Sequence, residues 1–346
     1  MSPAVLVFSS LLALAAAGSA NEKPRPLEVY WIDVEGGAAT LIVTPAGESV
    51  LVDAGNPGGR DAGRIFDVAT KSAGLRRIDH LVVTHLHRDH FGGVGELAEK
   101  MPVGTRYENG IESAPEKERS QPELEAFRRA KVGRRVVIKP GDTFELAQSA
   151  AAGKLSLHVL AARQALAPGG PAHGNAALCK SLESHEPDSS DNANSVVLLL
   201  ELGPFRFFDG GDLTWNVESR LVCPDDRVGP VDVYQSTHHG LDQSNNAVLV
   251  KTLQPRVVVF NNGPRKGAEP GTFATVAATP SVEGVYQVHR NVREGASNAA
   301  PAHIANEPEA CAGNPIQMSV EPTGDAYTLI VPSTGHHQTY RTRGAR

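Results

Sequence analysis

The stretch Thr84-His85-Leu86-His87-Arg88-Asp89-His90-Phe91-Gly92-Gly93 decides the fold of this chain. It follows an apolar, β-branched run at residues 79–83, which predicts a buried strand. His85 and His87 point to the same side of an extended segment, whereas Asp89 and His90 come after the chain has begun to turn. Imidazole and carboxylate are the ligands of zinc and related metals, so this strand end predicts a metal site. One such loop can serve two ions, which in hydrolytic sites lie about 3.5–4 Å apart.

The motif His85-x-His87-x-Asp89-His90, followed by Gly92-Gly93, resembles the signature of the metallo-β-lactamase fold superfamily. That resemblance implies an α/β fold, in which two halves pack sheet to sheet as an αββα sandwich over residues 21–292. Further matches follow in the expected order along the chain: Asp53-Ala54-Gly55, Gly211-Asp212 and His238-His239-Gly240. The same order, over roughly residues 28–290, is also similar to the metallo domain of competence-related DNA-uptake proteins.

By this resemblance the cofactors are two divalent metal ions, zinc with manganese as the alternative. His85 and His87 bind one ion, while Asp89, His90 and His239 bind the other. Asp212 bridges both, and Asp53 supports the loop without binding metal. His238 faces the substrate or the ligands, although the roles of His238 and His239 could be exchanged. The expected catalytic residues are Asp89, Asp212 and His238.

The third ligand of the first ion is not fixed by the sequence. The superfamily often supplies a histidine in a Gly-His-Thr-Pro-Gly context, which is absent here. The long irregular stretch of residues 164–193, typical of a functional or a disordered loop, lies where this ligand is expected. The candidates in and beside it are His173, His185, Asp191 and Asn194.

The ends of the chain have a different character. The apolar run near the amino terminus, followed by Gly18-Ser19-Ala20, predicts a signal peptide at residues 1–20 and export to the periplasm or the extracellular space. Cys179, Cys223 and Cys311 could then form one disulfide and leave one thiol. Residues 293–346 are expected to be a linker and a short C-terminal β-hairpin appendage.

Regular elements are expected throughout the central part. Helices are expected at 60–73, 93–100, 121–131 and 245–253, and strands at 27–34, 40–44, 49–53, 135–138, 143–146, 155–162, 195–202, 205–209, 231–237, 256–260 and 285–289. This strand-and-helix rhythm predicts layers of helix over sheet.

The combined prediction is an exported, binuclear metal-dependent hydrolase that uses a metal-bound hydroxide. A phosphoester or phosphodiester is the first expected substrate. The likeness to the competence-related metallo domain implies it, and Arg265 and Lys266 lie on a loop that could reach an anion. The alternatives are a β-lactam or another cyclic amide or ester, or a non-catalytic exported metal-binding protein. A net charge of −6 over 346 residues implies no general attraction to nucleic acid or to an anionic membrane, and oligomeric state is left open.

Overall fold

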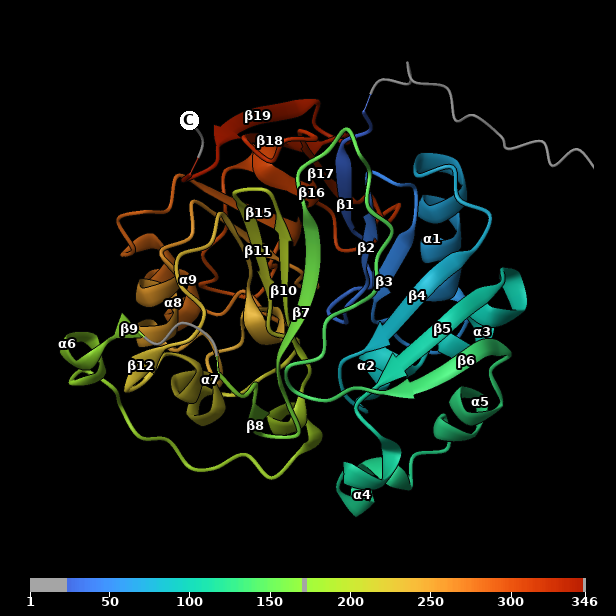
Figure 1. Cartoon of the computed structure of the whole chain (residues 1–346), viewed down its shortest axis with the longest axis horizontal. Coiled ribbons are helices and arrows are strands. Elements are labelled where there is room, and N and C mark those ends of the chain that lie inside the picture. Colours follow the sequence, from blue (N-terminus) through green and yellow to red (C-terminus); the bar gives the residue numbers. More distant parts are fainter. Residues whose placement is uncertain (1–23, 170–172, 345–346) are drawn as a thin grey trace, which may run out of the picture.

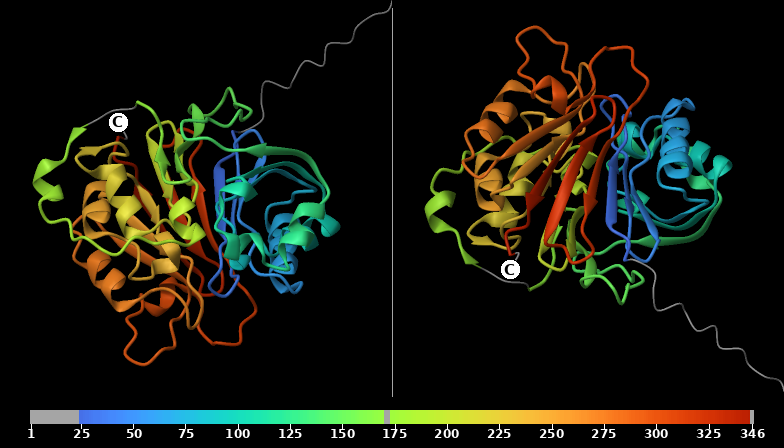
Figure 2. Two further views of the ribbon diagram at one scale, coloured as in Figure 1. Left: turned by 90° about the horizontal axis from the view of Figure 1, so that it is seen from below. Right: turned by 90° about the horizontal axis from the view of Figure 1, so that it is seen from above.

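The computed structural model describes residues 24–169 and 173–344. Two large β-sheets face each other, and helices cover the outer face of each (Figures 1 and 2). The expected αββα layering is therefore confirmed for the described residues. The signal peptide expected at residues 1–20 lies outside them. No helix in the described ranges combines the length and the apolar character needed to cross a membrane.

The first sheet has nine strands in the order β19-β18-β17-β1-β2-β3-β4-β5-β6. Its strands are β1 (Leu27–Trp31), β2 (Thr40–Val43), β3 (Ser49–Val52), β4 (Ile78–Val83), β5 (Val103–Glu108), β6 (Val132–Val137), β17 (Ile316–Val320), β18 (Ala326–Val331) and β19 (His336–Arg341). The antiparallel meander β1-β2-β3 is followed by the parallel strands β4, β5 and β6.

The second sheet has eight strands in the order β16-β15-β14-β13-β11-β10-β7-β8. Its strands are β7 (Leu155–Ala162), β8 (Ala165–Leu166), β10 (Val197–Leu202), β11 (Phe205–Asp209), β13 (Val233–Gln235), β14 (Val257–Phe260), β15 (Gly284–His289) and β16 (Ile304–Asn306). A separate two-stranded ladder joins β9 (His173–Gly174) to β12 (Asp225–Asp226).

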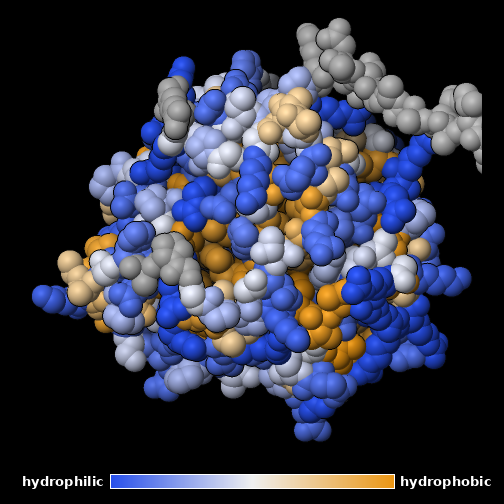
Figure 3. All heavy atoms as spheres, viewed as in Figure 1, coloured by the Kyte–Doolittle hydropathy of each residue, from blue (hydrophilic) through white to orange (hydrophobic). Residues whose placement is uncertain are grey.

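The helices form the outer layers. They are α1 (Arg60–Asp67), continued by a π-helical turn at Val68–Ser72, α2 (Arg88–Phe91), α3 (Val94–Lys100), α4 (Glu116–Arg119), α5 (Leu124–Arg129), α6 (Ala176–Cys179), α7 (Trp215–Val222), α8 (Ala247–Leu253) and α9 (Pro270–Ala277). Two short 3₁₀ turns, η3 (Asp191–Asn194) and η4 (Thr237–Gly240), precede β10 and follow β13. The space-filling view shows hydrophobic side chains mainly in the hollows of one face, between hydrophilic ones (Figure 3).

Three apolar clusters account for this layering. One fills the space between the two sheets and includes Trp31, Leu200 and Phe207. The other two lie under the helices on the outer faces, around Phe91 on one side and Leu249 on the other. Burial of apolar area at about 25 cal/mol per Å² makes such clusters the main source of stability.

The C-terminal segment differs from the expectation for residues 293–346. The predicted hairpin is present as β17 and β18, but β19 adds a third strand and β17 pairs with β1 along its whole length. Its inward side chains, including Met318 and Leu329, lie fully buried in the core between the sheets. Residues 316–341 therefore belong to the sandwich and are not an appendage, because they cover an edge that β1 would otherwise expose.

Two further elements differ locally from their expected form. Residues 143–146 do not form a strand. Within this segment only Thr143 forms a bridge, an isolated one to His158 of the following strand β7. Strand β5 was not expected, because Gly104, Thr105 and a fully buried Arg106 interrupt its apolar pattern. Arg106 is tolerated there because its guanidinium pairs with Glu108 at 2.7 Å.

Candidate metal centre

The expected site residues lie at the carboxyl ends of strands from both sheets. Strand β4 of the first sheet runs into the histidine loop and α2. Strands β11 and β13 of the second sheet run into Gly210–Asp212 and η4. The two edges are joined directly, since the Val196 amide donates to the Thr84 carbonyl at 3.0 Å. Within the second sheet, the His238 amide donates to the Gly211 carbonyl at 2.9 Å. The fold thus brings together loops that are far apart in sequence.

Four side chains converge at this junction: Asp89, His90, Asp212 and His239. Their ligand atoms all lie within 4.8 Å of one another, and all four side chains are largely or fully buried. Oδ2 of Asp212 lies 3.1 Å from Nε2 of His90 and 3.2 Å from Nε2 of His239. The two Nε2 atoms face each other at 3.3 Å. Two imidazoles and two carboxylates in this arrangement fit one divalent transition metal ion.

Asp53 orients His90, as the resemblance implied. Its Oδ2 accepts a hydrogen bond from Nδ1 of His90 at 2.7 Å, which directs the lone pair of Nε2 into the cluster. Both Asp53 oxygens also accept from Thr84, at 2.8 Å from its amide and 2.7 Å from its hydroxyl. Asp53 therefore ties the end of β3 to the end of β4 beneath the site.

The close packing of the histidine loop against the preceding turn requires glycine at position 93. The Gly93 amide donates to the Gly55 carbonyl at 3.1 Å. A Cβ atom at Gly93 would lie 2.2 Å from the Ala54 carbonyl oxygen, which is sterically impossible without a shift of the backbone. Glycine at this position therefore lets the histidine loop rest on the Asp53-Ala54-Gly55 turn.

The charges of the cluster favour a cation. Burial would raise the pKa of Asp212, but the neighbouring His239, His90 and His238 hold it well below its usual value. Burial likewise lowers the pKa of His90, yet Asp212, Asp53 and Asp89 raise it well above its usual value. The carboxylates are ionised and favour the protonated, positively charged form of His90. A bound metal ion would supply positive charge at the same place.

His85 and His87 lie beside this cluster and not within it. His85 is fully buried, and its Nε2 has no hydrogen-bond partner and lies 3.9 Å from Oδ2 of Asp212. Burial and the nearby His90 lower the pKa of His85 well below its usual value, so its ring is neutral and able to bind a metal. The ring centroids of His85 and His87 are 4.7 Å apart, so the two imidazoles lie next to each other.

A carboxylate that the sequence reasoning missed stands beside His87. Oε1 of Glu118, from α4, lies 3.4 Å from Nε2 of His87, and the other Glu118 oxygen is buried without a partner. Asp191, one of the four candidates for the third ligand, also lies in this region, but its Oδ2 accepts from the Leu86 amide at 2.7 Å and its Oδ1 from Asn194 at 2.8 Å. Asp191 therefore uses both carboxylate oxygens to hold the histidine loop and Asn194 in place, whereas one carboxylate oxygen of Glu118 has no hydrogen-bond partner.

The two remaining candidates lie elsewhere. His173 is exposed and pairs with Asp226 in the two-stranded ladder, and His185 stacks on Trp215 at 4.1 Å between ring centroids. Neither has a described contact with His85 or His87. Glu118 could not be found from sequence, because it sits in the charged run Glu116–Arg119, which is typical of a solvated helix.

The tandem histidines occupy an unusual backbone turn. His238 and His239 have φ values of 54° and 57°, in the left-handed region that residues other than glycine rarely adopt. This turn places the His239 ring among the four converging side chains. His238 lies beside it, with Nε2 at 3.3 Å from the Asn192 side-chain nitrogen and 3.5 Å from Oδ2 of Asp212, and Nδ1 at 3.2 Å from the Ser244 hydroxyl. Burial lowers the pKa of His238 to about 4, so its ring is neutral at physiological pH.

Lys266 and Arg265 have separate surroundings. The Lys266 ammonium forms an ion pair with Oδ2 of Asp89 at the mouth of the cluster and keeps 39% of its side chain exposed. Arg265 points away and pairs with Glu309 at 2.5 Å. Only Lys266 of this pair stands at the candidate site.

A comparison with protein families finds a match over part of the chain. Residues 32–163 match the model of the metallo-beta-lactamase superfamily. This segment belongs to the metallo-beta-lactamase superfamily. The match includes Asp53 and the whole histidine loop, while Asp212 and the tandem histidines lie beyond it and are placed by the fold. The αββα sandwich agrees with this family.

Several solved structures are similar to this chain at low sequence identity. A candidate metal-dependent hydrolase from Parabacteroides distasonis is 14% identical over 77% of this chain and 94% of its own, with a TM-score of 0.41. Zinc-bound PqqB from Methylobacterium extorquens is 13% identical over 76% of this chain and 98% of its own, with a TM-score of 0.44. CmlA, a diiron β-hydroxylase from Streptomyces venezuelae, is 18% identical over 69% of this chain and 45% of its own, with a TM-score of 0.35. No curated protein sequence matches the chain.

Proposed function

We propose that this protein is an exported binuclear metal-dependent hydrolase that acts on a phosphoester or phosphodiester. The observation that supports it most is the convergence of Asp89, His90, Asp212 and His239 within 4.8 Å, beside the unpartnered Nε2 of His85. A buried polar atom without a hydrogen-bond partner destabilises the folded state unless a ligand binds to it. The donor set fits metal ions of the zinc and manganese kind.

The ligands divide into two groups around Asp212. Asp89, His90 and His239 would hold one ion. His85, His87 and Glu118 would hold the other, with Asp212 lying 3.2 Å from Nε2 of His239 and 3.9 Å from Nε2 of His85 and able to serve both. Such ions, when bound, lower the pKa of a water molecule and polarise the substrate oxygen.

The protein's own residues would bind and orient the substrate. Lys266 supplies a positive charge at the mouth of the cluster, and its ammonium would be available to an anionic group if Asp89 served as a metal ligand. His238 is neutral, and Asn192 and Ser244 fix its ring beside Asp212, so it is placed to hold a substrate oxygen or to exchange a proton. A phosphoester, with its anionic oxygens, suits the Lys266 charge better than a neutral amide does.

The substrate class can be tested with two chromogenic compounds. We expect the metal-loaded protein to turn over a nitrophenyl phosphodiester and to leave a chromogenic cephalosporin unchanged. The Asp212→Asn and Asp89→Asn variants should lose this turnover while keeping the wild-type circular dichroism spectrum. Turnover of the cephalosporin alone would favour the cyclic amide and ester alternative. Full activity in the Asp212→Asn variant would contradict the assignment of the site.

A non-catalytic role is favoured by one specific feature. The first group, counted with Asp212, supplies four protein donors, and structural zinc sites are usually closed by four protein ligands. A protein with this role would bind about one ion at this centre, with no turnover of phosphoesters, amides or esters. The measured metal content and the substrate comparison together separate the two functions.

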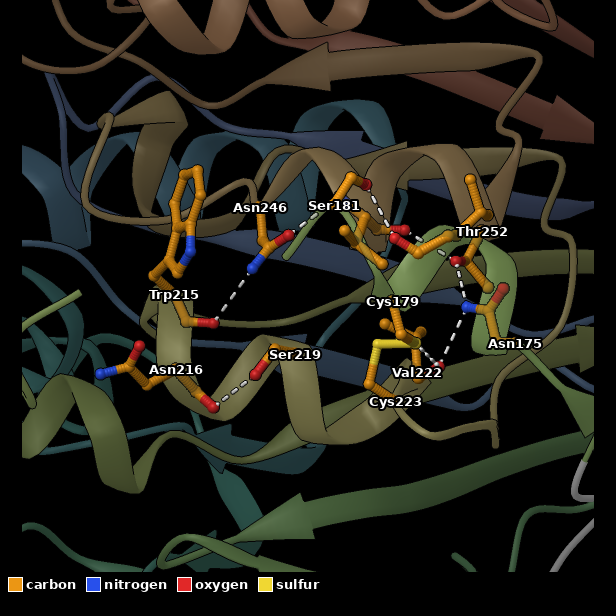
Figure 4. Close-up of a disulfide and its surroundings, with 12 residues drawn as sticks. Asn175, Cys179, Ser181, Trp215, Asn216, Ser219, Val222, Cys223, Asn246 and Thr252 are labelled. Atoms are coloured by element: carbon orange, nitrogen blue, oxygen red, sulfur yellow. Dashed lines mark hydrogen bonds between the residues drawn. A yellow bond between two sulfur atoms is a disulfide. The ribbon is translucent and has the colours of Figure 1, made fainter. Parts of the chain in front are cut away.

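Export is supported by the disulfide between Cys179 and Cys223 (Figure 4). Disulfides persist in oxidising compartments and are rare in the cytosol. N-terminal sequencing of the protein recovered from the periplasm or the medium tests this. A mature protein that begins near residue 21 supports export, and an intact Met1 in the cytosolic fraction contradicts it.

A further inference from the structure

A second cluster of metal-ligating side chains lies apart from the candidate centre and shares none of its ligands. Asp33 follows β1, His289 ends β15, and Cys311 lies in the loop between β16 and β17. One ligand atom from each lies within 4.8 Å of the others. Asp33 and His289 are fully buried, and Cys311 is half-buried.

His289 is oriented as a metal ligand. Its Nδ1 lies 3.0 Å from the Arg290 carbonyl oxygen, which can only accept, so Nδ1 carries the ring proton. The lone pair then resides on Nε2, which is buried without a hydrogen-bond partner. A ring fixed by an Nδ1–H bond to a backbone carbonyl, with Nε2 free, is the usual state of a metal-binding histidine.

The Cys311 thiol donates a hydrogen bond to the Asp33 carboxylate, and a bound cation could take the place of this proton. The Sγ of Cys311 donates to Oδ2 of Asp33 at 3.0 Å. Burial and the hydrogen bond to Asp33 raise the pKa of this thiol to about 11, so it stays protonated in the absence of a metal. A bound metal ion deprotonates a coordinating thiol. The proton would leave to solvent while the sulfur lone pair forms the bond to the cation.

Arg64 is the group that competes with a cation here. Its guanidinium lies 3.2 Å from Oδ2 of Asp33 and 3.8 Å from the Cys311 sulfur. It is also held by the Asp33 carbonyl at 3.1 Å and by Glu35 at 3.3 Å. Arg64 can therefore keep these partners and release the Asp33 carboxylate with a small movement. The negative charges of Asp33, Glu35 and a Cys311 thiolate would offset those of Arg64 and the metal ion.

We propose that Asp33, His289 and Cys311 form a second zinc-binding site, with a water molecule in the fourth position. Thiolate, imidazole and carboxylate are all zinc ligands, with bonds of about 2.0–2.3 Å that span the observed separation after small side-chain shifts. The ion would join β1 of the first sheet to β15 of the second and to the loop that leads into β17. This proposal does not rest on the hydrolase function, because the two sites have no residue in common.

Cobalt substitution tests it, because only thiolate ligation gives a Co²⁺ complex an intense near-ultraviolet charge-transfer band. Cys311 is the one cysteine outside the disulfide. We expect Co²⁺ to produce this band in the metal-depleted protein, and the Cys311→Ser variant to lose the band and about one equivalent of metal. The Asp212→Asn variant should keep the band, which separates this site from the candidate centre.

The controls keep the outcome decisive. The Cys179→Ser/Cys223→Ser variant should retain the band, which excludes those two sulfurs as its source. If Cys311→Ser does not fold, His289→Gln retains the thiol and should still weaken the band and speed the reaction of Cys311 with a thiol reagent in the presence of zinc. Absence of the band in the wild-type protein, with unchanged thiol reactivity on addition of zinc, would overturn the proposal.

Discussion

Oδ2 of Asp53 accepts a hydrogen bond of 2.7 Å from Nδ1 of His90, and this contact fixes which nitrogen of His90 faces the candidate metal centre. We predict that Asp53→Asn lowers metal affinity about 10–100-fold, the usual cost of losing such a support. Asparagine tolerates the left-handed backbone of Asp53, whose φ is 61°, so the fold should survive. Competition with a chromogenic chelator measures the affinity, and circular dichroism checks the fold. Unchanged affinity in a folded variant would show that Asp53 has no such role.

The disulfide should contribute measurably to stability. Cys179, at the end of α6, is bonded to Cys223, after α7, and closes a loop across a sequence separation of 44 residues. Beside it, Asn175 joins α6 to Thr252 of α8 at 2.8 Å (Figure 4). We predict that Cys179→Ser/Cys223→Ser lowers the free energy of unfolding by about 2–4 kcal/mol. Denaturant titration measures this, and reduction of the wild-type protein should give a similar loss. Equal midpoints for oxidised and reduced protein would contradict the prediction.

Lys266 should determine the preference for anionic substrates. A hydrogen bond to a partly exposed ammonium stabilises the transition state by about 1.4 kcal/mol, near the lower end of the range for charged hydrogen bonds, and this energy corresponds to about tenfold in kcat/KM. We therefore predict that Lys266→Met lowers kcat/KM about tenfold for a phosphodiester and leaves a neutral ester unaffected. Arg265→Met is the matched control, because Arg265 is held by Glu309 and should have no effect. Equal losses in both variants would argue against a specific role for Lys266.

A buried carboxyl away from the metal centre gives a prediction about pH. Glu218 accepts hydrogen bonds from the amides of Asn245 at 2.9 Å and Asn246 at 2.8 Å, and burial raises its pKa to about 7. Between its unfolded pKa of about 4.3 and this folded value, the folded state binds the additional proton. Stability therefore falls as pH rises through this window, by up to about 1.4 kcal/mol per pH unit from this group.

The Glu218→Gln variant removes that titration. We predict that its free energy of unfolding declines less steeply than that of the wild-type protein between pH 5 and about 7. Glutamine also loses one of the two amide contacts, so the comparison must rest on the slope with pH and not on a single value. Denaturant titrations at several pH values give both slopes. Parallel slopes would mean that Glu218 does not titrate in this range.

The local motifs predicted the part of the site that is continuous in sequence. The order of Asp53, the histidine loop, Asp212 and the tandem histidines carries the resemblance to the metallo-β-lactamase superfamily, and that resemblance implied the αββα layering. The ends of β7, β10 and β11 were also close to those expected, since their apolar runs are bounded by turn residues.

The remaining features depend on contacts between distant segments. Glu118 looks like a solvated helix residue until the fold buries it against His87. The three C-terminal strands looked like an appendage because nothing local shows that β17 pairs with β1. The cluster of Asp33, His289 and Cys311 is likewise formed only when both sheets are in place. No local pattern carries such information.

Metal content of the purified Cys311→Ser variant is the most direct test of the candidate centre, because this variant removes the proposed second zinc site. Elemental analysis after reconstitution should give about two equivalents of zinc or manganese, and Asp212→Asn in the same background should lower this value. One equivalent would mean that His85, His87 and Glu118 do not hold an ion. No bound metal in a folded protein would contradict the account.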